Sequence, residues 1–177
     1  MELTPIAHRF IDHWGEMGHN WGVNRTVAQI HALLFFHGRP LNAEEIADTL
    51  GAARSNVSTS LKELSSWGLI RASRREGDRR DYFETSSDVW ELLRTIVRER
   101  KQREFDPTSQ LLRELIAEPA FEAEPPDAQD RVHETLRLME SLGIWTEEML
   151  RLSPATLDKI LRLGASVQRF VRGKDGG

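Results

Sequence analysis

The stretch "AARSNVSTSLKELSSWGLIRAS", residues 52–73, joins an apolar stripe to an unusually small and polar surface. Val57, Leu61 and Leu64 are spaced i, i+4 and i+7, which predicts a helix that packs along one side only. Between residues 54 and 60 the other positions hold four small hydroxyl residues, one Asn and one Arg. Ser and Thr are weak helix formers because their hydroxyls compete for backbone hydrogen bonds. A helix that exposes them instead of Glu and Lys is suited to close approach to another polar surface.

The residues around this helix predict a helix-turn-helix followed by a hairpin. A short helix precedes it, with Asn42 as N-cap, Glu45 completing a capping box and Gly51 in the turn. Gly68 is the expected left-handed cap after residue 67. Residues 69–74 and 80–85 then predict two short strands around the polar turn 76–79. Together these signals indicate a winged helix-turn-helix with a two-stranded wing.

The rest of the chain predicts helices, so the fold class is mainly α. Two helices, residues 3–19 and 25–37, precede the helix-turn-helix, and four follow the wing at residues 89–103, 106–118, 130–150 and 154–172. Asp106 and Pro107 are expected as N-cap and first helical residue, and residues 118–127, with three prolines, as a flexible linker. We expect a DNA-binding domain over residues 1–105 and a helical dimerisation or regulatory region over residues 106–177.

Composition and charge set the broad class. The 177 residues are 39% hydrophobic and 29% charged, and they include no cysteine, which excludes disulfides and thiolate sites. With no apolar run long enough to span a bilayer and no signal-peptide pattern at the start, we expect a cytoplasmic protein without a membrane partner. The net charge of −4 is unevenly spread. Residues 54–82 hold seven basic and four acidic residues, whereas residues 104–134 hold nine acids and two arginines.

A basic segment in an acidic chain is the charge distribution of a nucleic-acid contact surface. Short hydroxyl and amide side chains reach phosphates or base edges without holding a helix out of the major groove, and Arg54 and Asn56 are capable of bidentate base contacts. Arginines of the wing suit a minor groove. The predicted contacts to double-stranded DNA are Arg54, Ser55, Asn56, Ser58, Thr59 and Lys62 on the helix and Arg74, Arg75, Arg79 and Arg80 on the wing.

A second function class stays open beside DNA binding. Winged helices also serve as protein-interaction scaffolds, and a polar helix face or an arginine run can simply be solvated. Asp78 and Asp81 flank the arginine pair, and they either orient the guanidinium groups or only form the turn. The basic wing and the small polar helix face favour DNA over the scaffold.

The run 41–82, together with the wing residues "GDRRDYF" at 77–83, resembles the MarR superfamily of bacterial regulators. The longer run "GDRRDYFETSSDVWELLRTIVRERKQREFDP", residues 77–107, more specifically resembles its GbsR-type branch. The similarity covers residues 6–115 and is weak after Pro119. It implies a homodimeric winged-helix repressor that binds a palindromic operator through a recognition helix at residues 54–67 and through Arg79 and Arg80. Some relatives respond to choline-like osmolyte precursors.

Apolar stripes on the flanking helices predict the dimer independently, because a small winged helix cannot cover them. Trp14, Trp21 and Trp90 are expected in the core or dimer interface. A sharper alternative is an aromatic cage for a quaternary ammonium effector. The stripes are Ile6, Phe10, Trp14 and Met17, then Val132, Leu136, Met139 and Leu142, and finally Leu157, Ile160, Leu161 and Val167.

The sequence contains no complete motif for catalysis or metal binding. His8, Asp12, Glu16 and His19 could share a helical face, but no metalloprotease-type spacing accompanies them. The sequence has no glycine-rich phosphate loop and no nucleophile elbow. We therefore expect neither an enzyme nor a cofactor or metal site.

Overall fold

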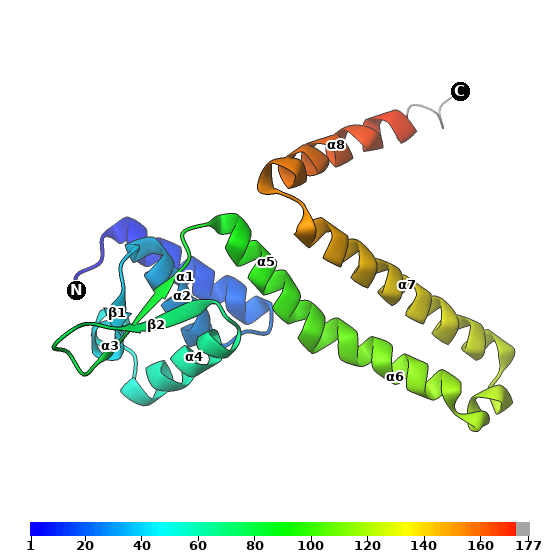
Figure 1. Ribbon diagram of the computed structural model, residues 1–177, viewed down its shortest axis with the longest axis horizontal. Coiled ribbons are helices and arrows are strands. Elements are labelled where there is room, and N and C mark those ends of the chain that lie inside the picture. Colours follow the sequence, from blue (N-terminus) through cyan, green and yellow to red (C-terminus); the bar gives the residue numbers. More distant parts are fainter. Residues whose placement is uncertain (173–177) are drawn as a thin grey trace. The chain divides into compact units, whose positions relative to one another are not determined.

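The computed structural model describes the backbone of residues 1–172 and the side chains of residues 1–163. It is 74% helical with a small three-stranded antiparallel sheet, which confirms the mainly α winged-helix fold. The chain divides into two compact units, Met1–Val97 and a second that begins at Arg98 (Figure 1). Within the described part, no helix is long and apolar enough to cross a membrane.

The core of the first unit forms around α2 (Arg25–His37), a helix whose bounds agree with the sequence prediction. Seven of its thirteen residues are buried, including Ile30 and Leu33 at 0% exposure. Helix α1 (Pro5–Asn20), capped by Thr4, packs along it. The helices approach closely at Gly18, where an added Cβ would lie only 2.4 Å from the Ala28 Cβ.

The helix-turn-helix consists of α3 (Ala43–Leu50) and α4 (Arg54–Ser66). Asn42 and Glu45 form the predicted capping box at the start of α3, and Gly51 adopts the left-handed conformation at its end, with φ of 61°. Val57, Leu61 and Leu64 of α4 are at most 3% exposed, so the predicted stripe is confirmed as the buried side of this helix. Its opposite side remains at the surface.

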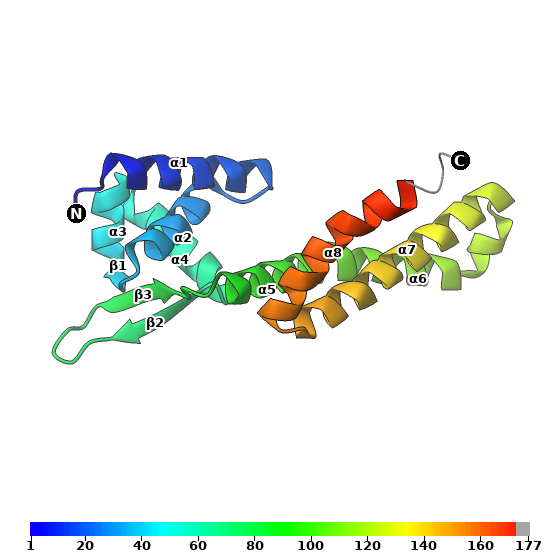
Figure 2. The same ribbon diagram turned by 90° about the horizontal axis from the view of Figure 1, so that it is seen from above.

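The wing is a hairpin of β2 (Ile70–Arg74) and β3 (Asp81–Thr85), and Figure 2 shows it extending from the helices of the first unit. A third strand that the sequence analysis did not predict, β1 (Leu41–Asn42), pairs antiparallel with β3. Asn42 therefore lies opposite Tyr82 in the sheet and also caps α3. The strand joins the wing to the helix-turn-helix.

The base of the wing is hydrogen-bonded to α2 through a buried histidine. The Thr85 hydroxyl donates to the Leu69 carbonyl oxygen at 2.8 Å and lies 3.2 Å from His31 Nε2. Because the single hydroxyl hydrogen is used on Leu69, His31 Nε2 must donate to Thr85, which requires the tautomer protonated there. Burial lowers the pKa of His31 to about 4, so the ring is neutral at neutral pH.

After the wing, α5 (Val89–Arg100) and α6 (Asp106–Ala117) are joined by a π-helical turn, Lys101–Phe105. The prediction that Asp106 caps a new helix is wrong, because its φ of −63° and ψ of −44° are helical. Its carboxylate instead accepts a hydrogen bond from Lys101 Nζ at 2.8 Å. Lys101 also pairs with Glu147 at 2.9 Å.

A helical hairpin of α6 and α7 (Pro126–Arg151) forms the second unit together with α8 (Pro154–Arg172), and both views show α6 beside α7. The predicted flexible linker contains a 3-10 turn, Pro119–Ala123, and α7 begins four residues earlier than expected. Val167 lies outside the described side chains. Among the described side chains from residue 98 onward, only Ser109 and Leu157 are buried.

The buried histidine makes stability depend on pH. The folded pKa near 4 is below the ordinary 6.5, so between these pH values the unfolded chain binds more protons than the folded one. The free energy of unfolding should therefore fall as pH drops from 6.5 toward 4, by about 3 kcal/mol at most. Urea denaturation at several pH values measures this. H31Q should flatten the dependence and H133Q, at an exposed histidine, should not; an unchanged profile in H31Q would contradict this assignment.

Candidate nucleic-acid interface

The outward side of α4 carries short polar side chains that are accessible to solvent. All six helix residues predicted as DNA contacts are exposed, whereas Ser60, the fourth hydroxyl residue of the stretch, is buried at 4% exposure. Arg54, the first residue of α4, has a side chain 73% exposed and an ion pair with Glu44 of α3, Nη1 to Oε1, at 3.1 Å. The exposed residues are Arg54, Ser55, Asn56, Ser58, Thr59 and Lys62.

A cleft of about 680 Å³ brings this helix face together with the wing. Ser58 and Lys62 of α4 and Arg80 of the wing line it, so three predicted contact residues from two elements face one concavity. Glu44 and Asp81 are also in its lining. The cleft is therefore not uniformly basic, although its cations come from the two elements that the sequence singled out.

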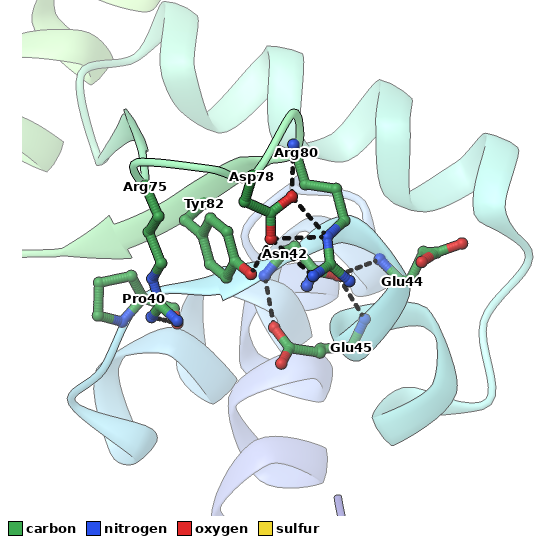
Figure 3. Close-up of polar contacts among 8 residues, drawn as sticks. All are labelled: Pro40, Asn42, Glu44, Glu45, Arg75, Asp78, Arg80 and Tyr82. Carbon is green, nitrogen blue, oxygen red and sulfur yellow. Dashed lines mark hydrogen bonds and ion pairs between the residues drawn. The ribbon is translucent and has the colours of Figure 1, made fainter.

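At the wing, Asp78 holds Arg80 in a fixed position (Figure 3). Arg80 donates through Nε at 3.0 Å and through Nη2 at 2.6 Å to the two carboxylate oxygens, and its backbone N–H donates to the same group at 3.0 Å. The hydroxyl of Tyr82 donates to Asp78 Oδ2 at 2.8 Å. These donors, Arg80 first, hold the pKa of the Asp78 carboxyl well below its usual range. Asp78 thus orients a guanidinium group, and the turn-only alternative is excluded.

The other wing arginines differ in their surroundings. The Arg75 guanidinium lies over the Tyr82 ring, 3.9 Å from its centroid, and Arg74 Nε donates to Asp81 at 2.9 Å. Asp81 therefore pairs with Arg74 and not with Arg79 or Arg80. Arg79 is exposed and, among the described residues, has no hydrogen bond or ion pair. Its charge is available to an external anion without breaking an existing contact.

Two participants were missed by the sequence analysis. Glu44 was not considered beyond its place in a short helix, and Tyr82 was noted only as part of the resemblance. Asp78, Arg80 and Tyr82 alternate at i, i+2 and i+4, which is the spacing of one face of an extended chain. That alternation was the available signal for the Asp78 contacts.

The three tryptophans of the predicted effector cage lie on different segments. Trp14 stacks on Phe10 at a ring-centroid distance of 5.3 Å, and Phe10 also contacts Phe36 at 5.4 Å. Trp21 follows the end of α1 with 59% exposure, and Trp90 is half-buried in the first turn of α5. The structure places Trp14 in an aromatic cluster on α1 and α2, and a cage with Trp21 and Trp90 stays a prediction.

No group of three or more His, Cys, Asp or Glu side chains in the described part of the chain could hold a metal ion. The predicted helical-face set of His8, Asp12, Glu16 and His19 lies along α1. There, Asp12 accepts a hydrogen bond from Gln29 Nε2 at 3.1 Å.

Comparison with known proteins finds a family match over part of the chain. Residues 21–81 match the model of the MarR family. The matched segment runs from the residue after α1, through α2 and the helix-turn-helix, to the first residue of β3. Residues 21–81 are therefore similar to the winged-helix segment of the MarR family, and the GbsR-type branch stays a prediction.

Two relatives accompany the MarR match. A putative HTH-type transcriptional regulator of Bacillus subtilis (strain 168), YvaV, is 21% identical over 97 residues. The match covers 51% of this chain and 55% of that protein, so it spans about half the length of the relative. A crystal structure described as a transcriptional regulator superposes with a TM-score of 0.65 at 22% identity, over 82% of this chain and 96% of that one. The latter shows a shared fold.

The wing contacts predict a local loss of order on removing Asp78. In D78N the amide no longer offers two charged acceptor oxygens, so Arg80 should become mobile while the core, which excludes this exposed hairpin tip, keeps its melting temperature. Backbone heteronuclear NOE values at residues 77–81 measure this. D81N, which affects Arg74, is the matched control and should leave Arg80 ordered. Equal effects of the two substitutions would show that Asp78 has no special role.

Proposed function

We propose that the chain is a sequence-specific DNA-binding transcriptional regulator, a repressor, that binds a palindromic operator as a homodimer. The observation that carries the proposal is the cleft in which the small polar face of α4 meets Arg80 of the wing. The MarR family match over residues 21–81 supports it. With DNA as its partner, a bacterial regulator of this kind acts in the cytoplasm.

In this proposal α4 enters the major groove and the wing follows the neighbouring backbone. Arg54 and Asn56 read base edges, because both side chains are capable of bidentate hydrogen bonds and both are exposed. Ser55, Ser58 and Thr59 permit close approach, and Lys62 binds phosphate. Arg79 reaches the minor groove, while Arg80 presents a guanidinium already fixed by Asp78.

The alternative, a protein-interaction scaffold, fits the surface less well. Protein-interface cores are depleted of charge and enriched in aromatic side chains. The exposed side of α4 instead has hydroxyls, an amide and two cations, and the wing adds four arginines. Such a surface is matched by the phosphates and base edges of a duplex.

DNA binding is tested with operators selected from a random duplex library by the purified protein. R79A should weaken binding to every duplex and reduce the slope of log K against log salt by about 0.9, the value of one phosphate contact. N56A should instead cost about 1–3 kcal/mol at particular base pairs. R131A on α7 removes the same charge and should change neither. Failure of the wild type to enrich any sequence would refute the proposed function.

The homodimer is proposed from the second unit, whose described side chains, residues 98–163, form no buried core. Of the predicted α7 stripe only Leu142 is exposed, because Val132, Leu136 and Met139 are half-buried. The exposed stripe, at i, i+4 and i+7, is instead Leu138 at 60%, Leu142 at 42% and Trp145 at 59%. On α6, Leu111 and Leu115 are 53% and 39% exposed. Apolar stripes on a helical hairpin need a covering surface, and a second copy of the hairpin supplies a matching one.

The exposed stripe of α7 gives the test of the dimer. L138Q/L142Q should shift the protein from dimer to monomer at micromolar concentration, because two apolar contacts are lost while helix propensity is nearly preserved. Light scattering with size-exclusion chromatography measures the mass. V89Q, at an exposed apolar position of α5, is the control and should remain dimeric. A wild-type monomer under the same conditions would contradict the dimer.

A further inference from the structure

Glu44 introduces a negative charge into the surface proposed to face DNA. It is half exposed and lies at the start of α3, where its Oε1 pairs with Arg54 Nη1 at 3.1 Å. It lines the same cleft as Lys62 and Arg80. Figure 3 shows it on α3 near the Asp78–Arg80 pair, and its charge raises the pKa of Arg80, after the larger effects of Asp78 and Tyr82.

The pair joins the two helices of the helix-turn-helix but contributes little to holding them together. Both side chains are at least half exposed, at 73% and 50%, and exposed ion pairs are weak in water. Val57 and Ile46, each 0% exposed, already fix α4 and α3 in the core. The position of Glu44 therefore has its main effect on Arg54, which was singled out as a base-reading residue.

Glu44 has different consequences on matching and non-matching DNA. On a non-matching duplex, Arg54 can neutralise a phosphate only by leaving Glu44, and the freed carboxylate then faces the phosphate backbone. On a matching site, a bidentate contact to guanine O6 and N7 compensates for the lost pair. The Glu44 carboxylate thus lowers the affinity for all DNA, and it lowers the affinity most on duplexes that offer Arg54 no matching base edge.

We propose that Glu44 is a specificity-determining residue of the DNA interface, which acts by restraining Arg54. The inference rests on the proposed DNA binding and adds to it a device that suppresses non-specific binding. Specific recognition depends on the ratio between the two kinds of binding, so weakening the non-specific one raises selectivity without any added base contact.

The test compares wild type, E44Q and D48N on a selected operator and on a 30-base-pair duplex of random sequence, over a range of salt concentrations. E44Q should bind the random duplex roughly two- to fivefold more tightly, the scale of one exposed charge interaction, with a smaller gain on the operator. Its salt slope on the random duplex should steepen by about 0.9, because Arg54 is released to a phosphate. D48N removes one charge from the exposed end of the same helix and should change neither value much.

An R54Q background separates restraint of Arg54 from general repulsion. If Glu44 acts mainly through Arg54, adding E44Q to R54Q should raise the affinity for the random duplex much less than E44Q does in the wild-type background. An equal gain in both backgrounds, or equal effects of E44Q and D48N, would overturn the inference while leaving DNA binding intact. Absence of DNA binding by wild type and E44Q alike would instead overturn the proposed function, and the inference with it. Thermal melting of E44Q should match that of wild type.

Discussion

The first unit depends on the burial of α2. Its apolar residues face α1, α4 and β3, so one helix of thirteen residues supplies the packing surface for most of the unit. The arrangement leaves α4 only one side to bury, and Val57, Leu61 and Leu64 occupy it. The opposite side is thereby freed from any role in the core. Its small polar residues are compatible with folding because α2 has already provided the hydrophobic contact that α4 requires.

A second constraint couples the wing to the helix-turn-helix at Asn42. Its side chain accepts hydrogen bonds from the backbone N–H groups of Glu44 and Glu45, and its backbone pairs with Tyr82 of β3. Tyr82 in turn donates to Asp78, which fixes Arg80. This arrangement leaves Asn42 Nδ2 buried without a hydrogen-bond partner among the described residues. Burying a polar group without a partner is unfavourable and uncommon in proteins. Through Asn42, Tyr82 and Asp78, the start of α3 is connected to Arg80 of the wing by a continuous series of contacts.

Sequence patterns predicted the features that depend on neighbours along the chain. The stripe of α4 follows from helical periodicity, and the ends of α3 and α4 follow from glycines whose φ values of 61° and 68° favour that residue. The π-helical turn was missed because Asp106 and Pro107 are a typical helix start, and only tertiary contacts such as Lys101 with Glu147 show that the helix continues. Strand β1, with two residues, has too little pattern to detect and exists through its pairing with β3.

In the candidate site, too, some features follow from the sequence pattern and others depend on the folded structure. That the outward residues of α4 would be exposed could be deduced from the positions of three apolar residues, because a helix has a fixed period. Which carboxylate pairs with which arginine could not be deduced in this way, since Asp78 and Asp81 are both close to the wing arginines along the sequence. Strand register decides it: Arg74 lies directly opposite Asp81, which leaves Asp78 in the turn to Arg80. The choice of partner is thus a property of the hairpin and not of the charges alone.

The two units differ in where their folding free energy comes from. The first has a continuous buried core, whereas the described side chains of the second are nearly all at least partly exposed, with large apolar residues on α6 and α7. Burial of apolar surface is the main favourable contribution to folding, so a helical hairpin without it is marginal. In the proposed dimer, association supplies that burial, and the second unit folds and pairs in one equilibrium. The number of DNA-binding surfaces is then set by the same apolar contacts that stabilise the hairpin, which ties operator symmetry to the stability of the second unit.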